Sequence, residues 1–354
     1  MLNRILIFNP STDYALASGS SCYTPPASVR ALTESMAFLP ASFALPGDII
    51  LVPENAHISS DDIKNADENK LHIVKPGNLK SFISHSGRDF SDFYILPWGW
   101  NLPLRRELAD IGVPVTILPS EEWIADLRRL SHRRSSIRFN NLANSMLNDE
   151  SKSPLPIEFF DEESALEWYD THNPAFFKAP WSSSGRGILF TPDAEPAQVA
   201  SWIRGIIRRQ GSVIAEEAAD KLYDFATEWI ITDIPETQTP EAHFIGLSFF
   251  RTSFRGKYQG NMEGSQEEIS LHMKRCGIDL NDDILNIQKS CLEDLAGSYR
   301  GFCGIDMLSD KSGSIRICIE INWRLTMGCV SILKQNPRIL ERFRELHKSV
   351  VSQF

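Results

Sequence analysis

A stretch near the carboxyl end of the chain, residues 304–328, constrains the fold more than any other. It is typical of two short strands joined by a turn at residues 309–314, whose composition is that of tight connections. The second strand, residues 315–324, alternates between isoleucines and mostly polar residues. Because side chains alternate across a strand, we predict that the isoleucines face a core and that the polar residues lie on the opposite face.

The polar face of the second strand carries a carboxylate, an amide and a guanidinium, which belong to Glu320, Asn322 and Arg324. If the turn places Asp306 across from Cys318, a second carboxylate joins the same face. Carboxylate and amide oxygens held on strands suit Mg²⁺, which usually takes one or two carboxylates together with substrate phosphates. The alternative is a half-exposed hairpin whose acids are only solvated, but that would not require an amide and a guanidinium beside them.

The composition is that of an ordinary globular chain, with 354 residues and 42% of them hydrophobic, which is long enough for two or three domains. A net charge of −10 argues against nucleic acid as the main partner, because phosphate binding needs a basic surface. We expect no membrane association, since no apolar run approaches the roughly 20 residues of a span and no signal peptide is recognised. The six cysteines form no C-x-x-C pair, which indicates reduced, mostly buried thiols in a cytoplasmic protein.

The first third of the chain alternates short apolar strands with helices, which predicts a mostly parallel α/β sheet. The expected strands are residues 4–8, 48–52, 71–74, 93–96 and 113–118, and the expected helices are residues 28–43 and 102–111. No G-x-G-x-x-G follows the first strand, so a usual dinucleotide-binding domain is not supported. Polar loops at residues 9–14 and 97–101 follow two of the strands, where such sheets bind ligands; helix caps and core tryptophans are the alternative.

The remainder of the chain predicts a mixture of helices and strands. The expected helices are residues 121–146, 163–171, 198–210, 282–295 and 337–351, and the expected strands before the hairpin are residues 175–179, 188–190, 212–215, 228–232 and 244–250. The polar, proline-bearing segment at residues 147–156 has the composition of a junction between subdomains.

A second group of residues joins Lys178, a lysine in an apolar strand, to a loop of small residues at 182–187. A buried ammonium needs a counter-charge, and a Ser/Gly loop lets backbone N–H groups approach anionic oxygens. Together these features suit a polyphosphate. The loop is not a Walker loop, because G-x-x-x-x-G-K-[ST] is absent and a strand follows it.

Taken in order along the chain, these segments resemble the ATP-grasp superfamily, whose members include the D-alanine–D-alanine ligases and biotin carboxylase. The resemblance rests on residues 178–188, 213–217, 304–306 and 320–324, and it covers roughly residues 120–345. It implies an α/β protein in which a Rossmann-like parallel-sheet domain, residues 1–125, precedes a two-lobed α+β ATP-grasp domain, residues 126–354. The lobes would be residues 126–220, with the small-residue loop, and residues 221–354, with the metal-binding strands.

The resemblance also implies how the nucleotide is held. In that family a strand lysine contacts nucleotide phosphate, which implies Lys178, and a glycine-rich loop folds over the triphosphate. The loop residues so implied are Ser182, Ser183, Ser184, Gly185, Arg186 and Gly187. An acidic pair after the next strand meets adenine and ribose, which implies Glu216 and Glu217.

Further residues follow from the same resemblance. Members often carry an acid on a strand after the hinge, which implies Glu228, and a basic residue before the linker, which implies Arg134 or its neighbour Arg133 in place of the more usual lysine. An arginine holds the reacting phosphoryl or carboxylate group, which implies Arg324. The metal ions would be bound by Asp306, Glu320 and Asn322.

The function implied is an ADP-forming ligase that joins a carboxylate to an amine or a similar nucleophile through an acyl phosphate. Lys178 and Arg324 would stabilise the transferring phosphoryl group, helped by two Mg²⁺ ions or by Mn²⁺. The expected partners are ATP and small-molecule or peptide carboxylates and amines, with a homodimer left open. The alternatives are a phosphotransferase on the same fold and a catalytically silent nucleotide-binding regulatory protein.

Overall fold

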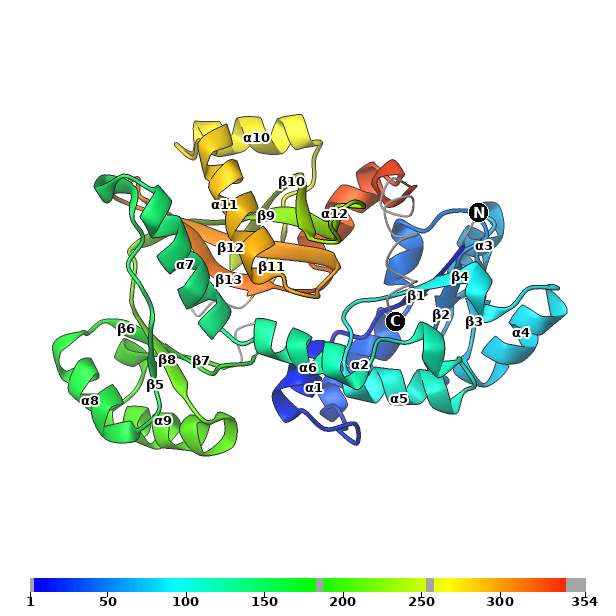
Figure 1. Ribbon diagram of the computed structural model, residues 1–354, viewed down its shortest axis with the longest axis horizontal. Helices are drawn as coiled ribbons and strands as arrows, with labels where there is room; N and C mark the ends of the chain where they lie inside the picture. The colour runs from blue at the N-terminus through cyan, green and yellow to red at the C-terminus, as the bar shows by residue number, and fades with distance from the viewer. Residues whose placement is uncertain (1–2, 183–186, 253–257, 342–354) are drawn as a thin grey trace.

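The computed structural model describes residues 3–182, 187–252 and 258–341, and Figure 1 shows that they form three regions, each built on one sheet. The N-terminal sheet is parallel and has the strand order β3-β2-β1-β4. The small sheet is antiparallel and has the order β5-β8-β6-β7. The large sheet is also antiparallel and has the order β11-β10-β9-β12-β13.

The N-terminal sheet forms from short, mostly apolar runs, and its two central strands, β1 and β2, are almost entirely buried. Its strands are β1 (Asn3–Ile7), β2 (Ile49–Leu51), β3 (His72–Val74) and β4 (Phe93–Pro97). The helices around it are α1 (Thr12–Ser18), α2 (Ala27–Ser35), α3 (Ser60–Glu68), α4 (Leu79–His85) and α5 (Leu102–Asp110). The expected parallel α/β region is therefore confirmed.

Two expectations for this region are wrong. Residues 113–118 do not form a fifth strand, because a short 3-10 helix, Val115–Ile117, takes their place. Pro114 directly before it has no N–H to give to a sheet, and Val115 is exposed rather than packed. The helix expected at residues 28–43 ends at Ser35, and a second 3-10 turn, Leu39–Ser42, follows at Pro40.

The small sheet carries its helices on one face and has a core of its own. Its strands are β5 (Ile157–Phe159), β6 (Ala175–Lys178), β7 (Ile188–Phe190) and β8 (Val213–Glu217), and its helices are α8 (Glu162–Thr171) and α9 (Pro196–Gln210). Phe177 and Ala215 from the strands pack against Val199 and Ile203 of α9, and all four are completely buried.

The large sheet is covered by helices on both faces (Figure 1). Its strands are β9 (Lys221–Asp233), β10 (Pro240–Thr252), β11 (Tyr258–Asn261), β12 (Gly301–Asp310) and β13 (Ile315–Asn322). The helices are α6 (Glu121–Leu130), α7 (Arg134–Met146), α10 (Gln266–Arg275), α11 (Asp282–Leu295) and α12 (Met327–Gln335). The single helix expected at residues 121–146 is thus two helices, and the helix expected at 337–351 falls largely outside the described residues.

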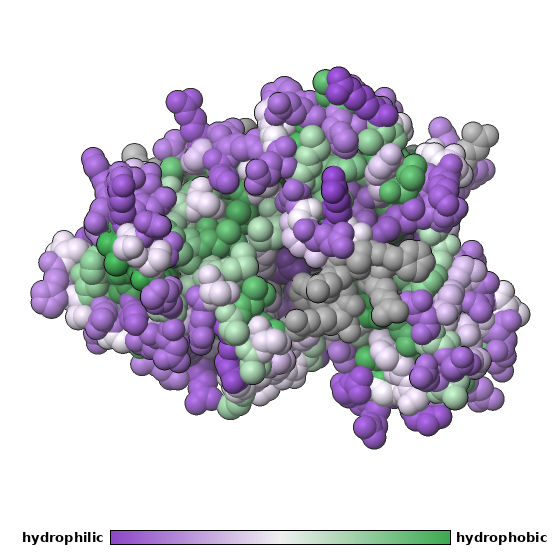
Figure 2. All heavy atoms as spheres, turned by 180° about the vertical axis from the view of Figure 1, so that it is seen from behind, coloured by the Kyte–Doolittle hydropathy of each residue, from purple (hydrophilic) through white to green (hydrophobic). Residues whose placement is uncertain are grey.

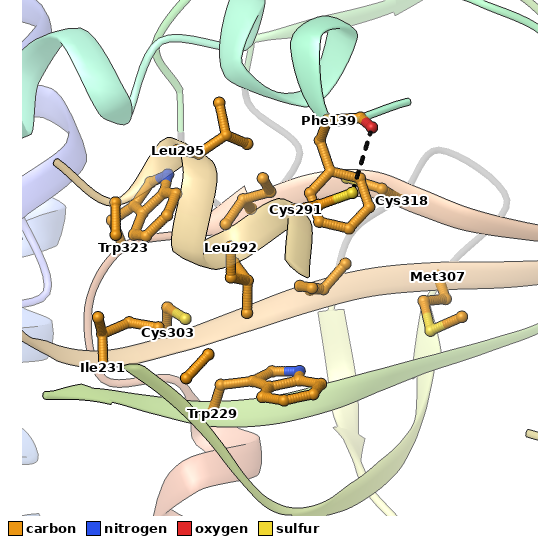
Figure 3. Packing of buried hydrophobic residues seen from close by; sticks show 14 of the residues in the cluster. Phe139, Trp229, Ile231, Cys291, Leu292, Leu295, Cys303, Met307, Cys318 and Trp323 are labelled. Atoms are coloured by element: carbon orange, nitrogen blue, oxygen red, sulfur yellow. Dashed lines mark hydrogen bonds between the residues drawn. The ribbon is translucent and has the colours of Figure 1, made fainter. Parts of the chain in front are cut away.

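One face of the large sheet packs against α7 and α11, and Figure 3 shows this core. Trp229 of β9 lies beneath α11, and Phe139 projects from α7 toward Cys291. The opposite face of the sheet packs against α12 and against the N-terminal sheet, where Leu6 and Phe302 belong to one buried cluster. The N-terminal and large sheets therefore share a core, whereas the small sheet does not take part in it.

The alternation expected along β13 is wrong in its middle. Asp306 pairs with Glu320, but Leu308 pairs with Arg316, so β13 carries two extra residues between these pairs. A bulge of this kind bends the strand and turns successive side chains to the same side. Cys318, expected on the polar face, consequently lies buried in the core.

The bulge is stabilised by two buried amide side chains from the covering helices. The Gln288 Nε2 group donates to the carbonyl oxygen of Ile317 at 3.0 Å. The Asn140 Nδ2 group donates to the carbonyl oxygen of Cys318 at 2.9 Å. Because buried carbonyl groups without partners are costly, these amides allow the bulge to exist inside a core.

Candidate functional site

The three regions meet at a cavity of about 420 Å³. Its wall comes from the loops after β1 and β4, from the first residues of the loop between β6 and β7, and from β9 to β13 of the large sheet. Residues representing these elements are Pro10, Trp98, Ser182, Glu228, Asp306 and Arg324. The two polar loops singled out in the sequence therefore do reach the same cavity as the carboxylate hairpin.

The loops after β1 and β4 lie side by side because β2 and β3 extend from one edge of β1 while β4 pairs with the other. Parallel sheets bind ligands at this kind of switch point. The Asn9 side chain donates to the carbonyl oxygen of Gly99 at 2.7 Å, and the Asn101 side chain donates to Thr12 Oγ1 at 3.2 Å. These bonds fix the start of α1, where Asp13 follows.

The two hairpin carboxylates are direct neighbours across the strands. The pairing of Asp306 with Cys318 considered from the sequence is not the one found, because Asp306 faces Glu320 itself, and a second carboxylate therefore does lie beside Glu320. The Asn322 amide donates to Asp306 Oδ2 at 3.1 Å. Burial, with the negative charges of Glu320 and Glu228 nearby, raises the pKa of Asp306 to about 8.

Arg324 follows the end of β13 and is held there by the side chains of Asp13 and Asn322. Its Nε and Nη2 groups lie 3.0 Å and 2.9 Å from carboxylate oxygens of Asp13, and Nη2 also donates to Asn322 Oδ1 at 2.8 Å. Burial is the largest single effect and works against the charged form, but the charge and hydrogen bond of Asp13 together with the charges of Glu320 and Asp306 outweigh it and raise the pKa of Arg324. Gly99 lies against Arg324, since a Cβ atom there would come within 3.2 Å of the Arg324 Cβ atom.

The two neighbouring arginines, Arg133 and Arg134, are placed differently. Arg133 is buried, donates to Ser182 Oγ at 2.8 Å and forms an ion pair with Glu320 at 2.9 Å. Arg134 instead lies at the start of α7 and forms two hydrogen bonds of 2.6 and 2.7 Å with Glu158 of the small sheet. The structure therefore brings Arg133, and not Arg134, into contact with two residues of the cavity wall, Ser182 and Glu320.

Lys178 has the buried counter-charge that its position requires. Its Nζ group pairs with Glu216, and both side chains are about nine-tenths buried. The pairing of β6 with β8 places these residues on adjacent strands. Glu217, the next residue, is exposed, and its Oε1 atom lies 3.8 Å from His172 Nε2. The two acids expected near adenine and ribose, Glu216 and Glu217, therefore have different environments.

The expected phosphate loop is described only at its ends, because Ser183, Ser184, Gly185 and Arg186 lie outside the described residues. Ser182 is buried and lines the cavity. Gly187 closes against it, since a Cβ atom at Gly187 would lie 2.4 Å from the Ser182 Cβ atom. Only glycine fits this position without displacing Ser182.

Glu228 is completely buried in the wall of the cavity. Three side chains donate to its carboxylate: Ser248 at 3.0 Å, Thr326 at 2.8 Å and Cys329 at 3.2 Å. The carboxylate fits only because Gly328 has no side chain, as a Cβ atom there would lie 1.9 Å from Glu228 Oε1. Burial raises the pKa of Glu228 to about 7 despite these donors.

The donor types fit the metal that the hairpin predicts. Asp306, Glu320 and Asn322 offer two carboxylates and an amide oxygen, and the crowded negative charge around Asp306 would be relieved by a cation. In residues 3–182, 187–252 and 258–341, no three His, Cys, Asp or Glu side chains converge on one metal position. Substrate phosphates and water would therefore complete the coordination, as is common for Mg²⁺.

Two features of the site were not found from the sequence. Asp13 was one polar residue in a loop, and only the fold shows that it meets Arg324 from the other end of the chain. The start of α12, where Thr326 caps the helix and also donates to Glu228, was assigned no role. A Thr followed by an apolar run is a helix-start signal that could have revealed α12.

Compared by sequence, the chain matches no protein-family model and none of the curated proteins. Compared by structure, it is similar to biotin carboxylase from Campylobacter jejuni, solved as a complex with β-γ-ATP, with 13% identity, a TM-score of 0.51, and coverage of 96% of this chain and 71% of that chain. It is also similar to pyruvate carboxylase from Rhizobium etli, with 13% identity and a TM-score of 0.51, over 96% of this chain and 28% of that chain.

The chain therefore has the ATP-grasp fold, and the predicted order of a parallel α/β region followed by α+β lobes is confirmed. None of the described helices combines the length and the apolar character that crossing a membrane requires. At this level of identity the likeness concerns the fold, so the function must be argued from the residues of the site.

Proposed function

We propose that the protein is an ATP- and Mg²⁺-dependent ligase that joins a carboxylate to an amine through an acyl phosphate and releases ADP and phosphate. The observation that carries the proposal is the line of groups along the end of the hairpin. Asp306, Glu320, Asn322 and Arg324 line one cavity, so two carboxylates, an amide and a guanidinium are adjacent, which supports their roles as metal ligands and anion-holding group. The ATP-grasp fold supports nucleotide use.

The residues would divide the work as follows. Lys178, with Ser182 at the start of the loop, would bind the phosphates, and Glu216 and Glu217 would lie near the nucleoside. Asp306, Glu320 and Asn322 would hold Mg²⁺, which when bound neutralises phosphate charge.

Arg324 would hold the substrate carboxylate against the γ-phosphorus through its positive charge and through the Nη1 N–H that is left free by Asp13, Asn322 and the Leu325 carbonyl oxygen. A carboxylate oxygen would attack phosphorus and ADP would leave. The amine would then attack the acyl carbon, and phosphate would leave.

The test combines binding with trapping. ATP with Mg²⁺ should raise the melting temperature more than either alone, with a gain of about 2.7 kcal/mol at ligand concentrations ~100-fold above the dissociation constant. Hydroxylamine should then convert an activated carboxylate to a hydroxamate, with ADP and phosphate formed in equal amounts. Asp306→Asn should abolish both responses, whereas Asp279→Asn, an exposed aspartate away from the cavity, should change neither.

Other outcomes would point to the alternatives. ADP formed together with a stable phosphorylated product, and no hydroxamate, would identify a phosphotransferase. ATP binding without turnover over a broad panel of acids and amines would identify a nucleotide-binding regulatory protein. No thermal shift with any nucleoside triphosphate would contradict the proposal as a whole.

A further inference from the structure

The cavity has two walls of opposite character. Asp306, Glu320, Asn322 and Arg324 make one end polar and charged. The wall supplied by the N-terminal region is apolar, and it comes from the end of β1, from α2 and from the end of β4. Its residues are Phe8, Pro10, Val29, Leu32, Met36 and Trp98. Figure 2 shows the molecule from behind, with hydrophobic surface leading into the hollow near the middle of that face.

The apolar wall is rigidly built where it meets the charged end. Phe8 and Trp98 are 4% and 8% exposed. Their rings pack edge to face, with 5.2 Å between the ring centroids. The carbonyl oxygen of Trp98 accepts a hydrogen bond of 2.9 Å from the backbone N–H of Leu325. The aromatic wall is therefore fastened to the residue that follows Arg324, and one ligand can touch both.

Part of this wall is open to solvent. Leu32 on α2 is 44% exposed, although it is an apolar residue at the edge of a cavity. A single exposed leucine is ordinary, but here it adjoins Val29 and Met36, which line the same cavity. An apolar ligand group would cover it and gain the free energy of removing that surface from water.

Two polar groups in the lining have no partner among the described residues. They are the hydroxyl group of Tyr14 and the Nδ2 group of Asn261, and both are buried. Buried donors of this kind normally have partners. They give the cavity a small number of fixed hydrogen-bonding points within apolar surroundings, which is typical of a site that orients a small molecule.

The residues assigned to the nucleotide lie apart from the apolar wall, in the small sheet. Lys178 and Glu216, the residues assigned to phosphate and nucleoside, pair with each other in the small sheet and do not line the cavity. The apolar wall is therefore assigned to the acid substrate, which would receive the phosphoryl group beside Asp306 and Glu320, and not to the nucleotide. A volume of about 420 Å³ falls within the usual range of small-molecule sites.

We propose that the carboxylate substrate is a monoacid with an apolar body, aliphatic or aromatic, whose carboxylate meets Arg324 and whose body lies against Trp98, Phe8 and Leu32. This inference rests on the proposed function and specifies its acid. A dicarboxylate is disfavoured because its second charge would be buried against the apolar wall without a counter-charge.

The first experiment compares acids of similar length in the hydroxamate assay, with ATP and Mg²⁺ saturating. Hexanoate and 3-phenylpropanoate should react with a higher kcat/KM than succinate and glutarate. Each additional methylene in a series of straight-chain acids should raise kcat/KM about fourfold until the cavity is filled. Equal or better reaction of the dicarboxylates would overturn the inference while leaving the ligase standing.

The second experiment uses a matched pair of variants. Leu32→Ser should raise the KM for 3-phenylpropanoate about tenfold with little change in kcat, because it removes apolar contact surface only. Leu271→Ser is the control, since Leu271 lies on α10, is 49% exposed and does not line the cavity. Equal KM values for the two variants would contradict the proposed wall.

The ATP-dependent thermal shift separates the remaining outcomes. The shift should be the same in Leu32→Ser and in the unaltered protein when no acid is present. A loss of that shift would mean that the wall holds the nucleotide base, which would overturn the inference. If no acid of either class gives a hydroxamate although ATP binds, the proposed ligase function itself fails, and the assignment of an acid falls with it.

Discussion

At the scale of single residues, the most unusual group is the Glu228 carboxylate. Its pKa of about 7 lies well above that of an unfolded glutamate because it is buried among neutral donors. Between about pH 4.5 and pH 7 the folded protein therefore binds a proton that the unfolded chain has lost. The contribution of this group to stability is fully present below that window and falls as the pH rises through it.

The first prediction is tested with Glu228→Gln, which keeps the shape and removes the titration. The stability of the unaltered protein relative to the variant should fall as the pH rises from 5 to 7, by at most about 1.4 kcal/mol per pH unit. Urea unfolding at several pH values measures the difference, and groups that do not interact with Glu228 cancel between the two proteins. A constant difference would show that Glu228 is ionised throughout.

Asp13 and Arg324 form the second residue-scale prediction. Asp13→Asn leaves a largely buried guanidinium without its anion and should lower the free energy of unfolding by about 2 to 3 kcal/mol. Asp279→Asn, which alters an exposed side chain, should change it by less than about 0.5 kcal/mol. Similar stabilities of the two variants would mean that the pair adds nothing to the folded state.

Arg324→Lys tests the role of the same residue in turnover. It preserves the charge near Asp13 but cannot reproduce the two parallel hydrogen bonds of a guanidinium. We expect a large loss in kcat with little change in ATP affinity, because a single ammonium group cannot contact Asp13, Asn322 and the reacting group at the same time. Steady-state kinetics together with the ATP-dependent thermal shift separate these effects. Full activity of the variant would remove Arg324 from the mechanism.

At the scale of elements, the bulge in β13 decides how the hairpin presents its acids. Without it, strict alternation would place Cys318 on the face of Glu320; with it, Cys318 enters the core and Asp306 faces Glu320. Gln288 bonds to the bulged carbonyl of Ile317 and accepts from Thr227 Oγ1 at 2.9 Å. The geometry of the predicted metal site thus depends on an amide from α11.

Gln288→Leu should therefore destabilise the protein by about 2 to 4 kcal/mol, because it leaves two buried polar groups without partners. It should also weaken the thermal shift given by ATP with Mg²⁺, since the bulge positions Glu320. Asn286→Leu is a suitable control, as Asn286 is an exposed residue on the same helix. A destabilised variant with an unchanged shift would show that the bulge and the metal site are independent.

Elements with one clear hydrophobic period were predictable from the sequence. The boundary between two adjacent helices with the same period was not. The apolar strands of the N-terminal sheet and the hairpin were found because each buries a continuous or alternating run. The break between α6 and α7 was missed because the helical pattern continues on both sides of it. That break decides which arginine reaches Ser182, so the choice between Arg133 and Arg134 needed the fold.

Contacts between segments far apart in the chain were the second kind of feature that the sequence could not predict. Sequence patterns report local periods, so they cannot show that Asp13 meets Arg324 or that Gln288 meets the bulge. The glycine at position 328 could be read only after the structure placed the Glu228 carboxylate against it. The residue types of the site were therefore predictable, whereas their partners were not.

At the scale of the whole molecule, the cores show how the regions are joined. The N-terminal and large sheets share a buried cluster, but the small sheet has its own. Polar contacts join the small sheet to α6 and α7: Trp181 Nε1 donates to the carbonyl oxygen of Arg128 at 2.9 Å, the Arg128 guanidinium lies 4.1 Å from the Trp181 ring, and Arg134 donates to Glu158. We propose domain boundaries near residues 125 and 220, although α7 packs on β13 of the large sheet.

This arrangement leads to the last prediction. Because the small sheet has an independent core, it can change its position relative to the large sheet without disturbing the N-terminal sheet. ATP with Mg²⁺ would bind between Lys178 of the small sheet and Glu320 of the large sheet. Hydrogen exchange should consequently slow in β6, β8 and β13 and stay unchanged in α3 and α4.

The control for that measurement removes both members of a buried ion pair, Lys178→Met with Glu216→Gln. The double variant avoids leaving either charge buried alone, so the small sheet should stay folded. It should, however, lose the binding of phosphate by Lys178. Exchange in the variant should then be the same with and without ATP and Mg²⁺. Slower exchange in α3 and α4 of the unaltered protein would mean that the nucleotide tightens the whole molecule, which would contradict independent movement of the small sheet.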